Sequence, residues 1–101
     1  MALHYWAYIF LSPGFDPQKH TTEMKSDSCR FKAVGIDMHK KEEVIAVAKK
    51  LVEEGVQMIE LCGGFGPVWV AKISEAIKDA IPVGMVAYGP EARKPLLDIL
   101  S

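Results

Sequence analysis

The chain has 101 residues, of which 50% are hydrophobic and 25% are charged, and this is the size and composition of one globular domain. Its 12 Lys and Arg residues are balanced by 13 Asp and Glu residues, for a formal net charge of −1. A nucleic-acid-binding surface needs a basic excess to neutralise phosphates. We therefore expect a single domain over residues 1–101 and no nucleic-acid partner.

The cysteines and the apolar N-terminal run indicate a cytoplasmic protein. Cys29 and Cys62 form neither a C-x-x-C pair nor a zinc-ligand spacing, which favours free thiols in a reducing compartment. The apolar run over residues 3–11 contains His4 and is roughly half as long as a helix that crosses a bilayer. We expect a cytoplasmic location and no membrane partner.

The first half of the chain predicts two strands and two helices. A strand over residues 4–11 is followed by Asp16 and Pro17, which predict the start of a short polar helix that reaches Lys25. Residues 31–36 predict a second strand, and Asp37 is the expected cap of the next helix. That helix ends at Gly55 and carries an apolar stripe of Val44, Val47, Ala48, Leu51 and Val52.

The second half predicts two more strands and two more helices. Residues 56–62 predict a third strand, and Pro67 predicts the start of a helix whose apolar face contains Val70, Ile73, Ile77 and Ala80. A fourth strand is predicted over residues 83–88. The last helix, over residues 90–100, is interrupted by Pro95 and is expected to turn Leu96, Leu97 and Leu100 inward.

This alternation predicts an α/β fold in the order β-α-β-α-β-α-β, with the last helix following. Such an order requires a mainly parallel sheet, here of four strands, because each helix returns the chain to the edge where strands begin. The sheet could be open and doubly wound, or it could resemble half of a β/α barrel. Four strands cannot close a barrel, so a half-barrel would need a second copy, and we expect a homodimer or a higher homo-oligomer.

Ligands of parallel α/β folds bind at the carboxyl ends of the strands. Four loops follow the predicted strands, and they bring polar side chains to this edge. The expected ligand-binding side chains are those of Asp16, His39 and Tyr88.

The glycine-rich turn after the third strand is the most distinctive feature of the sequence. Glycines at a strand-to-helix junction let backbone N–H groups approach an anion, so Gly63, Gly64 and Gly66 are candidate ligand-binding residues. The turn lacks the third glycine of a dinucleotide-binding fingerprint and the lysine of a phosphate-binding loop. The alternative is that these glycines serve only tight packing and positive φ.

Three residues near this edge are candidates for catalysis. Glu60 lies within a predicted central strand, where an unpaired carboxylate is costly, and it would act as an acid or base. The alternative for Glu60 is a structural ion pair, for example with Lys32 or Lys72, or a place at an exposed strand end. Cys62 precedes the turn and could be a nucleophile, or an inert buried thiol. Asp37 is the third candidate, as an acid or base.

No metal-ligand spacing is visible among the three histidines, and the residues indicate no particular cofactor. The aromatic residues of the first strand, Tyr5, Trp6, Tyr8 and Phe10, are expected in the core or at a subunit contact. Trp69 falls outside the apolar stripe of its helix, so it could cover a ligand or pack on a partner chain.

The string ELCGGFGP over residues 60–67 resembles a family of short prokaryotic proteins of unknown function. The resemblance extends to the opening strand with PGFDP at residues 13–17, to VEEGV at 52–56 and to IPVG at 81–84. It implies a stand-alone α/β protein and assigns no role to any residue.

Two functions from different classes fit the sequence. One is binding of a small anionic metabolite at the turn over residues 63–66, with or without catalysis. The other is a non-catalytic module that assembles through the aromatic first strand and Trp69. Residue types and spacing do not decide between an enzyme and a binding protein.

Overall fold

The computed structural model describes residues 2–100, which form one sheet, three α-helices and two 3-10 turns. The strands are β1 (Tyr5–Leu11), β2 (Thr21–Lys25), β3 (Arg30–Ile36), β4 (Ile59–Leu61) and β5 (Val83–Met85). The helices are α1 (Val44–Glu53), α2 (Gly66–Ala76) and α3 (Arg93–Leu100), and the 3-10 turns η1 (Lys41–Glu43) and η2 (Pro90–Ala92) precede α1 and α3.

The five strands lie in the order β2-β3-β1-β4-β5. β1 pairs with β3 and with β4 in parallel, β4 pairs with β5 in parallel, and β2 pairs with β3 in antiparallel orientation at the edge. The predicted α/β class with a mainly parallel sheet is confirmed, with one more strand than expected.

The additional strand replaces the helix predicted over residues 16–25, and that prediction was wrong. Asp16 does cap a turn, because its carboxylate accepts the Gln18 amide at 2.9 Å and its carbonyl accepts the His20 amide at 2.7 Å. The turn ends there, since the β-branched Thr21 and Thr22 favour a strand and pair with β3. Tertiary pairing therefore overrides the local helix-start signal.

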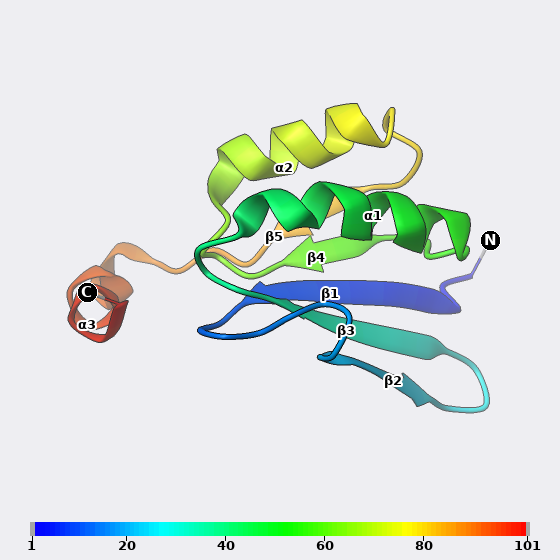
Figure 1. Cartoon of the computed structure of the whole chain (residues 1–101), viewed down its shortest axis with the longest axis horizontal. Coiled ribbons are helices and arrows are strands. Elements are labelled where there is room, and N and C mark those ends of the chain that lie inside the picture. The colour runs from blue at the N-terminus through cyan, green and yellow to red at the C-terminus, as the bar shows by residue number, and fades with distance from the viewer. Residues whose placement is uncertain (1, 101) are drawn as a thin grey trace.

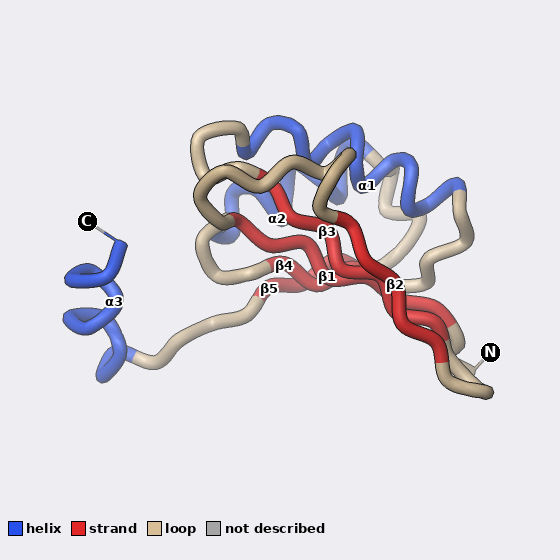
Figure 2. Tube along the Cα trace, turned by 60° about the horizontal axis from the view of Figure 1, so that its bottom comes forward, coloured by secondary structure: helices blue, strands red, loops and turns tan. Residues whose placement is uncertain are grey.

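Both helices that pack on the sheet lie on the same face, as Figure 1 and the turned view of Figure 2 show. The physical reason is the direction of the crossovers. The connections β3-α1-β4 and β4-α2-β5 both move toward β5 across the sheet, and two right-handed crossovers in one direction place their helices on one face. A helix between β1 and β3 would move the other way and cover the opposite face, but β2 occupies that connection.

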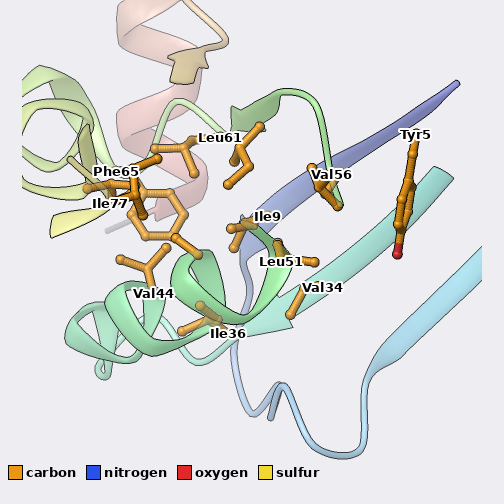
Figure 3. Close-up of a cluster of buried hydrophobic side chains, with 14 residues drawn as sticks. Tyr5, Ile9, Val34, Ile36, Val44, Leu51, Val56, Leu61, Phe65 and Ile77 are labelled. Atoms are coloured by element: carbon orange, nitrogen blue, oxygen red, sulfur yellow. The ribbon is translucent and has the colours of Figure 1, made fainter. Parts of the chain in front are cut away.

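The core lies between the sheet and these two helices and is formed by buried apolar side chains (Figure 3). The predicted stripe of α1 is confirmed, because Val44, Ala48 and Leu51 are buried and Val47 and Val52 pack against them. From the sheet, alternate residues point into the core, and these are Tyr5, Ala7, Ile9, Val34, Ile36, Ile59 and Leu61.

Gly55 ends α1 as predicted, with a φ of 94° that favours glycine. Asp37, however, is not the cap of α1. Its carboxylate accepts the His39 amide at 3.1 Å within a turn, and η1 separates this turn from α1.

Three predictions for the second half need correction. The fourth strand is short, because regular pairing of β5 ends at Met85 and residues 86–89 continue as an irregular link. Ala80 is exposed, because α2 ends before it. Leu97 and Leu100 do not turn inward but are 55% and 58% exposed, since α3 stands apart from the core.

The face of the sheet opposite the two helices carries no helix of the described residues (Figure 2), and we call it the bare face. The residues of the strands that alternate with the core residues point toward it. Trp6 packs on Phe31 with ring centroids 4.5 Å apart, and Phe10 packs on Phe15 of the following loop at 5.3 Å. The strand residues of this face are Trp6, Tyr8, Phe10, Thr22, Met24, Phe31, Ala33, Gly35, Glu60 and Gly84.

Gly35 and Gly84 make a matched pair on the bare face. A Cβ atom at Gly35 would overlap the ring of Phe15 and lie 3.0 Å from Phe10, whereas a Cβ atom at Gly84 meets nothing within 4 Å. We expect Gly35→Ala to lower the free energy of unfolding by about 1–3 kcal/mol through overpacking. Gly84→Ala should leave it unchanged or raise it by roughly 0.5–1 kcal/mol, because alanine has less chain entropy to lose. Urea denaturation measures both, and equal effects would contradict the packing of Phe15 over Gly35.

Candidate functional site

The carboxyl ends of the parallel strands lie along one edge of the sheet, and the loops that follow them are tied together there. The Ser12 amide donates to the Ile36 carbonyl at 3.0 Å, and the Val86 amide donates to the Leu61 carbonyl at 2.9 Å. The chain segments that begin at Asp37, Cys62 and Val86 therefore share this edge, as the parallel order requires.

The glycine-rich turn lies at this edge, between β4 and α2. The turn is closed by the Phe65 amide, which donates to the Cys62 carbonyl at 3.2 Å, and Gly66 begins α2 with a φ of 79°. Among the hydrogen bonds of the described residues, none uses the N–H groups of Gly63 or Gly64. Both donors are thus available beside the first turn of a helix, where backbone N–H groups also lack partners.

Gly63 has a packing role as well. A Cβ atom at this position would lie 3.0 Å from the Val86 carbonyl oxygen and 3.7 Å from the ring of Tyr88. The link after β5 therefore passes close to the turn only because residue 63 has no side chain. Both alternatives considered for these glycines, close packing and access to backbone donors, have a geometric basis.

Cys62 forms part of the sheet at this edge. Its amide donates to the Ile9 carbonyl at 3.0 Å, and its thiol sulfur accepts the Leu11 amide at 3.3 Å. The sulfur thus takes the place of a carbonyl in the ladder between β1 and β4. Cys62 is half-buried, and neither it nor Cys29 is in a disulfide.

Glu60 lies on the bare face and is half-buried, with Tyr8 beside it on β1 and Gly84 beside it on β5. Because this face carries no helix, the carboxylate is not enclosed as a doubly covered strand would enclose it. Neither ion pair considered for Glu60 is present among the described residues. Lys32 binds Glu54 at 2.8 Å on the opposite face, and Lys72 lies over the ring of Trp69 at 4.5 Å.

Tyr8 is the centre of a group of ionisable side chains that lie near the turn. Burial raises the pKa of Tyr8, and negative charge on Cys62, Tyr88 and Glu60 raises it further. These four groups are therefore close enough to interact electrically. Tyr88 is 63% exposed on the link after β5, so the group opens to solvent.

Tyr8 was not among the site residues expected from the sequence, which placed it with the other aromatic residues of the first strand in the core or at a subunit contact. The signal that would have found it is the alternation in β1. Tyr5, Ala7 and Ile9 are the buried set, so Tyr8 must point to the face that Glu60 shares.

The remaining expected site residues lie at the same edge but on the side of β3 and of the loop after β1. Asp37 follows β3, which is separated from β4 by β1. Asp16 holds a turn, and its amide donates to Nδ1 of His20 at 2.9 Å. His39 is exposed in the turn after β3. No contact joins them to Cys62 or Tyr88 among the hydrogen bonds of the described residues.

Trp69 packs against the core from α2, on the helix side of the sheet. It therefore lies on the opposite side from Trp6, Tyr8 and Phe10, and one flat interface cannot include both groups. Within residues 2–100 no group of three or more His, Cys, Asp and Glu side chains could hold a metal ion. In the same residues no helix is long and apolar enough for a membrane span.

A groove of about 320 Å³ lies on the helix side, between α1 and the segment that leads into β2. The Lys32–Glu54 ion pair lines it together with Val34, Val47 and Leu51. The hydrogen bond to Glu54 raises the pKa of Lys32, so this amine stays charged and paired. None of the lining residues belongs to the glycine-rich turn.

Comparison with protein families matches residues 4–101 to one family, described as a family of unknown function (DUF6506). Comparison with curated proteins and with solved structures finds no match. The family match covers nearly the whole chain and is consistent with the resemblance noted from residues 60–67.

The charged neighbours of Tyr8 lead to a titration experiment. We expect the phenol of Tyr8 to ionise above the ordinary tyrosine pKa of 10.0. Because the folded-state pKa is the higher one, the stability that Tyr8 contributes is complete below pH 10.0 and is lost as the pH rises through the folded-state value. Ultraviolet titration of the wild type minus that of Tyr8→Phe isolates this group. A difference curve with its midpoint at or below 10.0 would contradict both the burial of the Tyr8 phenol and its proximity to Cys62, Tyr88 and Glu60.

Proposed function

We propose that this chain, which belongs to the DUF6506 family, binds a small anionic molecule at the carboxyl edge of its sheet. The observation that carries the proposal is the pair of unused N–H groups of Gly63 and Gly64 at the start of α2. Such donors, together with the partial positive charge of a helix N-terminus, favour a phosphate or carboxylate group.

The side chains around the turn indicate how the proposed ligand is oriented. Its anionic group would lie at the glycine amides, away from Glu60, because two negative charges at close range repel. The phenol groups of Tyr8 and Tyr88 would donate to the rest of the ligand. Asp16, Asp37 and His39 would border it from the side of β3, and Gly66 would supply a further amide.

Catalysis would require a group that exchanges a proton or attacks the ligand. Glu60 is the acid or base of such a reaction and Cys62 its nucleophile, since both lie near Tyr8. Asp37 would act on a ligand that extends toward β3. The proposal of binding does not depend on these roles.

A second candidate function, assembly of several copies, is favoured by one specific observation. The bare face presents half-buried Trp6, Phe31 and other apolar side chains, and no helix of the described residues covers it. Contiguous apolar surface of this kind is typical of protein–protein contacts. We propose that this face, rather than Trp69, is the contact surface of a homo-oligomer.

Binding of an anion is tested with inorganic phosphate as the probe, at constant ionic strength. A ligand at ten times its dissociation constant stabilises a protein by about 1.4 kcal/mol, which raises the Tm of a domain of this size by roughly 5–10 °C. We expect phosphate to raise the Tm of the wild type in a thermal-shift measurement. We expect phosphorylated and carboxylated metabolites to do the same.

The Gly64→Val variant should lose this response, because the new side chain crowds the amides of the turn. Its Cβ atom meets Leu11 at 3.4 Å and Cys62 at 3.6 Å, which is ordinary contact, so the variant should fold. Ala71→Val, which adds the same branched side chain to the exposed surface of α2, is the matched control and should keep the response. An equal response in both variants would place the anion elsewhere.

Assembly through the bare face is tested by light scattering over a wide range of protein concentrations. We expect the wild type to exceed the 11.2 kDa of one chain, and Phe31→Lys to shift dissociation to at least about 10-fold higher concentration because it buries a charge in the contact. Val68→Lys on the outer surface of α2, where Val68 is 64% exposed, should behave like the wild type. A wild-type monomer at all concentrations would exclude this function.

A further inference from the structure

The helix α3 stands apart from the rest of the molecule. In Figures 1 and 2 it lies beyond the end of the sheet, joined to β5 by the link over residues 86–89. This projection helps to make the molecule 40 Å long against 26 and 25 Å in the other directions. The main contacts of α3 are with η2, which directly precedes it, and no residue of α3 is buried.

The sequence of α3 is amphipathic although the helix has no partner. At 3.6 residues per turn its four apolar residues lie in one arc, with Lys94 and Asp98 opposite. Ile99, Leu100 and Leu97 of this arc are 77%, 58% and 55% exposed. A helix of eight residues is marginal in water without packing, so α3 needs a surface on which its apolar arc is buried.

The bare face is the complementary surface within this chain. It is apolar and aromatic, and Glu60 is the charged residue among the strand positions that point to it. Arg93 lies within the apolar arc, in the first turn of α3, so the docked helix brings a positive charge to that carboxylate. The sheet edges are poorer contact surfaces, because β5 has only three residues and β2 carries Glu23 and Lys25.

The link over residues 86–89 determines whether α3 can pack on the sheet of its own chain or on that of a second copy. Four extended residues span about 13 Å, which carries α3 past the edge of its own sheet. Val86 and Tyr88 on this link are 38% and 63% exposed, and the contacts of the link with the glycine-rich turn do not bring α3 back over the sheet (Figure 1). A helix held away from its own sheet is placed to reach a neighbouring molecule.

We propose that α3 of one copy packs its apolar arc on the bare face of a second copy, and that the second copy does the same in return. The exchange makes a two-fold symmetric contact in which both unpartnered surfaces of each chain are covered. This inference rests on the second candidate function, assembly through the bare face, and names the segment and the partner.

The experiment compares two pairs of substitutions in the full chain. Leu97→Glu with Leu100→Glu places charges in the apolar arc, and Lys94→Glu with Asp98→Lys changes charges on the opposite side of α3. All four positions are exposed in the single chain, so both variants should fold with wild-type circular dichroism. We expect the first pair to raise the dissociation constant of the dimer at least about 100-fold and the second to leave it unchanged.

A second measurement reports on the bare face itself. The chain has two tryptophans, and Trp69→Phe leaves Trp6, which lies on this face, as the single fluorophore. Dimerisation should shield Trp6 from a soluble quencher, and the Leu97→Glu, Leu100→Glu pair should remove this protection.

The outcomes separate the two proposals. A dimer that needs the apolar arc and shields Trp6 supports the exchange of α3. A dimer that persists with the charged arc overturns the exchange but keeps assembly through the bare face, with the two sheets in contact. A wild-type monomer whose Trp6 is shielded at every concentration shows α3 on its own sheet and overturns both.

Discussion

The handedness of the crossovers is the constraint on which the rest of this structure depends. Right-handed connections that move in one direction across a parallel sheet place their helices on one face, and here both helical crossovers move toward β5. The one connection that moves the other way, from β1 to β3, contains β2 instead of a helix. One face of the sheet therefore receives the whole core, and the aromatic side chains of the other face stay half-buried, packed on one another and on Phe15.

The same constraint explains the chemistry of the candidate site. Glu60 is tolerated in an interior strand because it points to the face without helices, beside Tyr8, rather than into the core. The thiol sulfur of Cys62 accepts a hydrogen bond from the Leu11 amide within the sheet, and Cys62 also lies near Tyr8. The glycine turn lets the link after β5 pass closely, because a side chain at Gly63 would meet the Val86 carbonyl. The link after β5 therefore borders the proposed anion site and also carries α3 away from the sheet.

Prediction from the sequence worked best where periodicity and strong local signals agree. The stripe of α1, its end at Gly55, the first strand and the common edge of Asp37, Cys62 and Tyr88 all follow from such patterns. Prediction failed over residues 16–25, because Asp16 and Pro17 can begin a single turn as well as a longer helix, and here they begin a single turn. It also failed at α3, whose amphipathic pattern indicates an apolar contact but not which molecule supplies it.

The sequence by itself determined the α/β class, the mainly parallel sheet and the edge to which the loops after the parallel strands lead, because these depend on alternation and on short-range signals. Only the tertiary structure decided that residues 21–25 pair as an edge strand, that one face is bare and that Tyr8 and Glu60 meet there. These features depend on which strands become neighbours and in which direction each connection crosses the sheet. Contacts between distant segments fix both, and no local window of residues contains them.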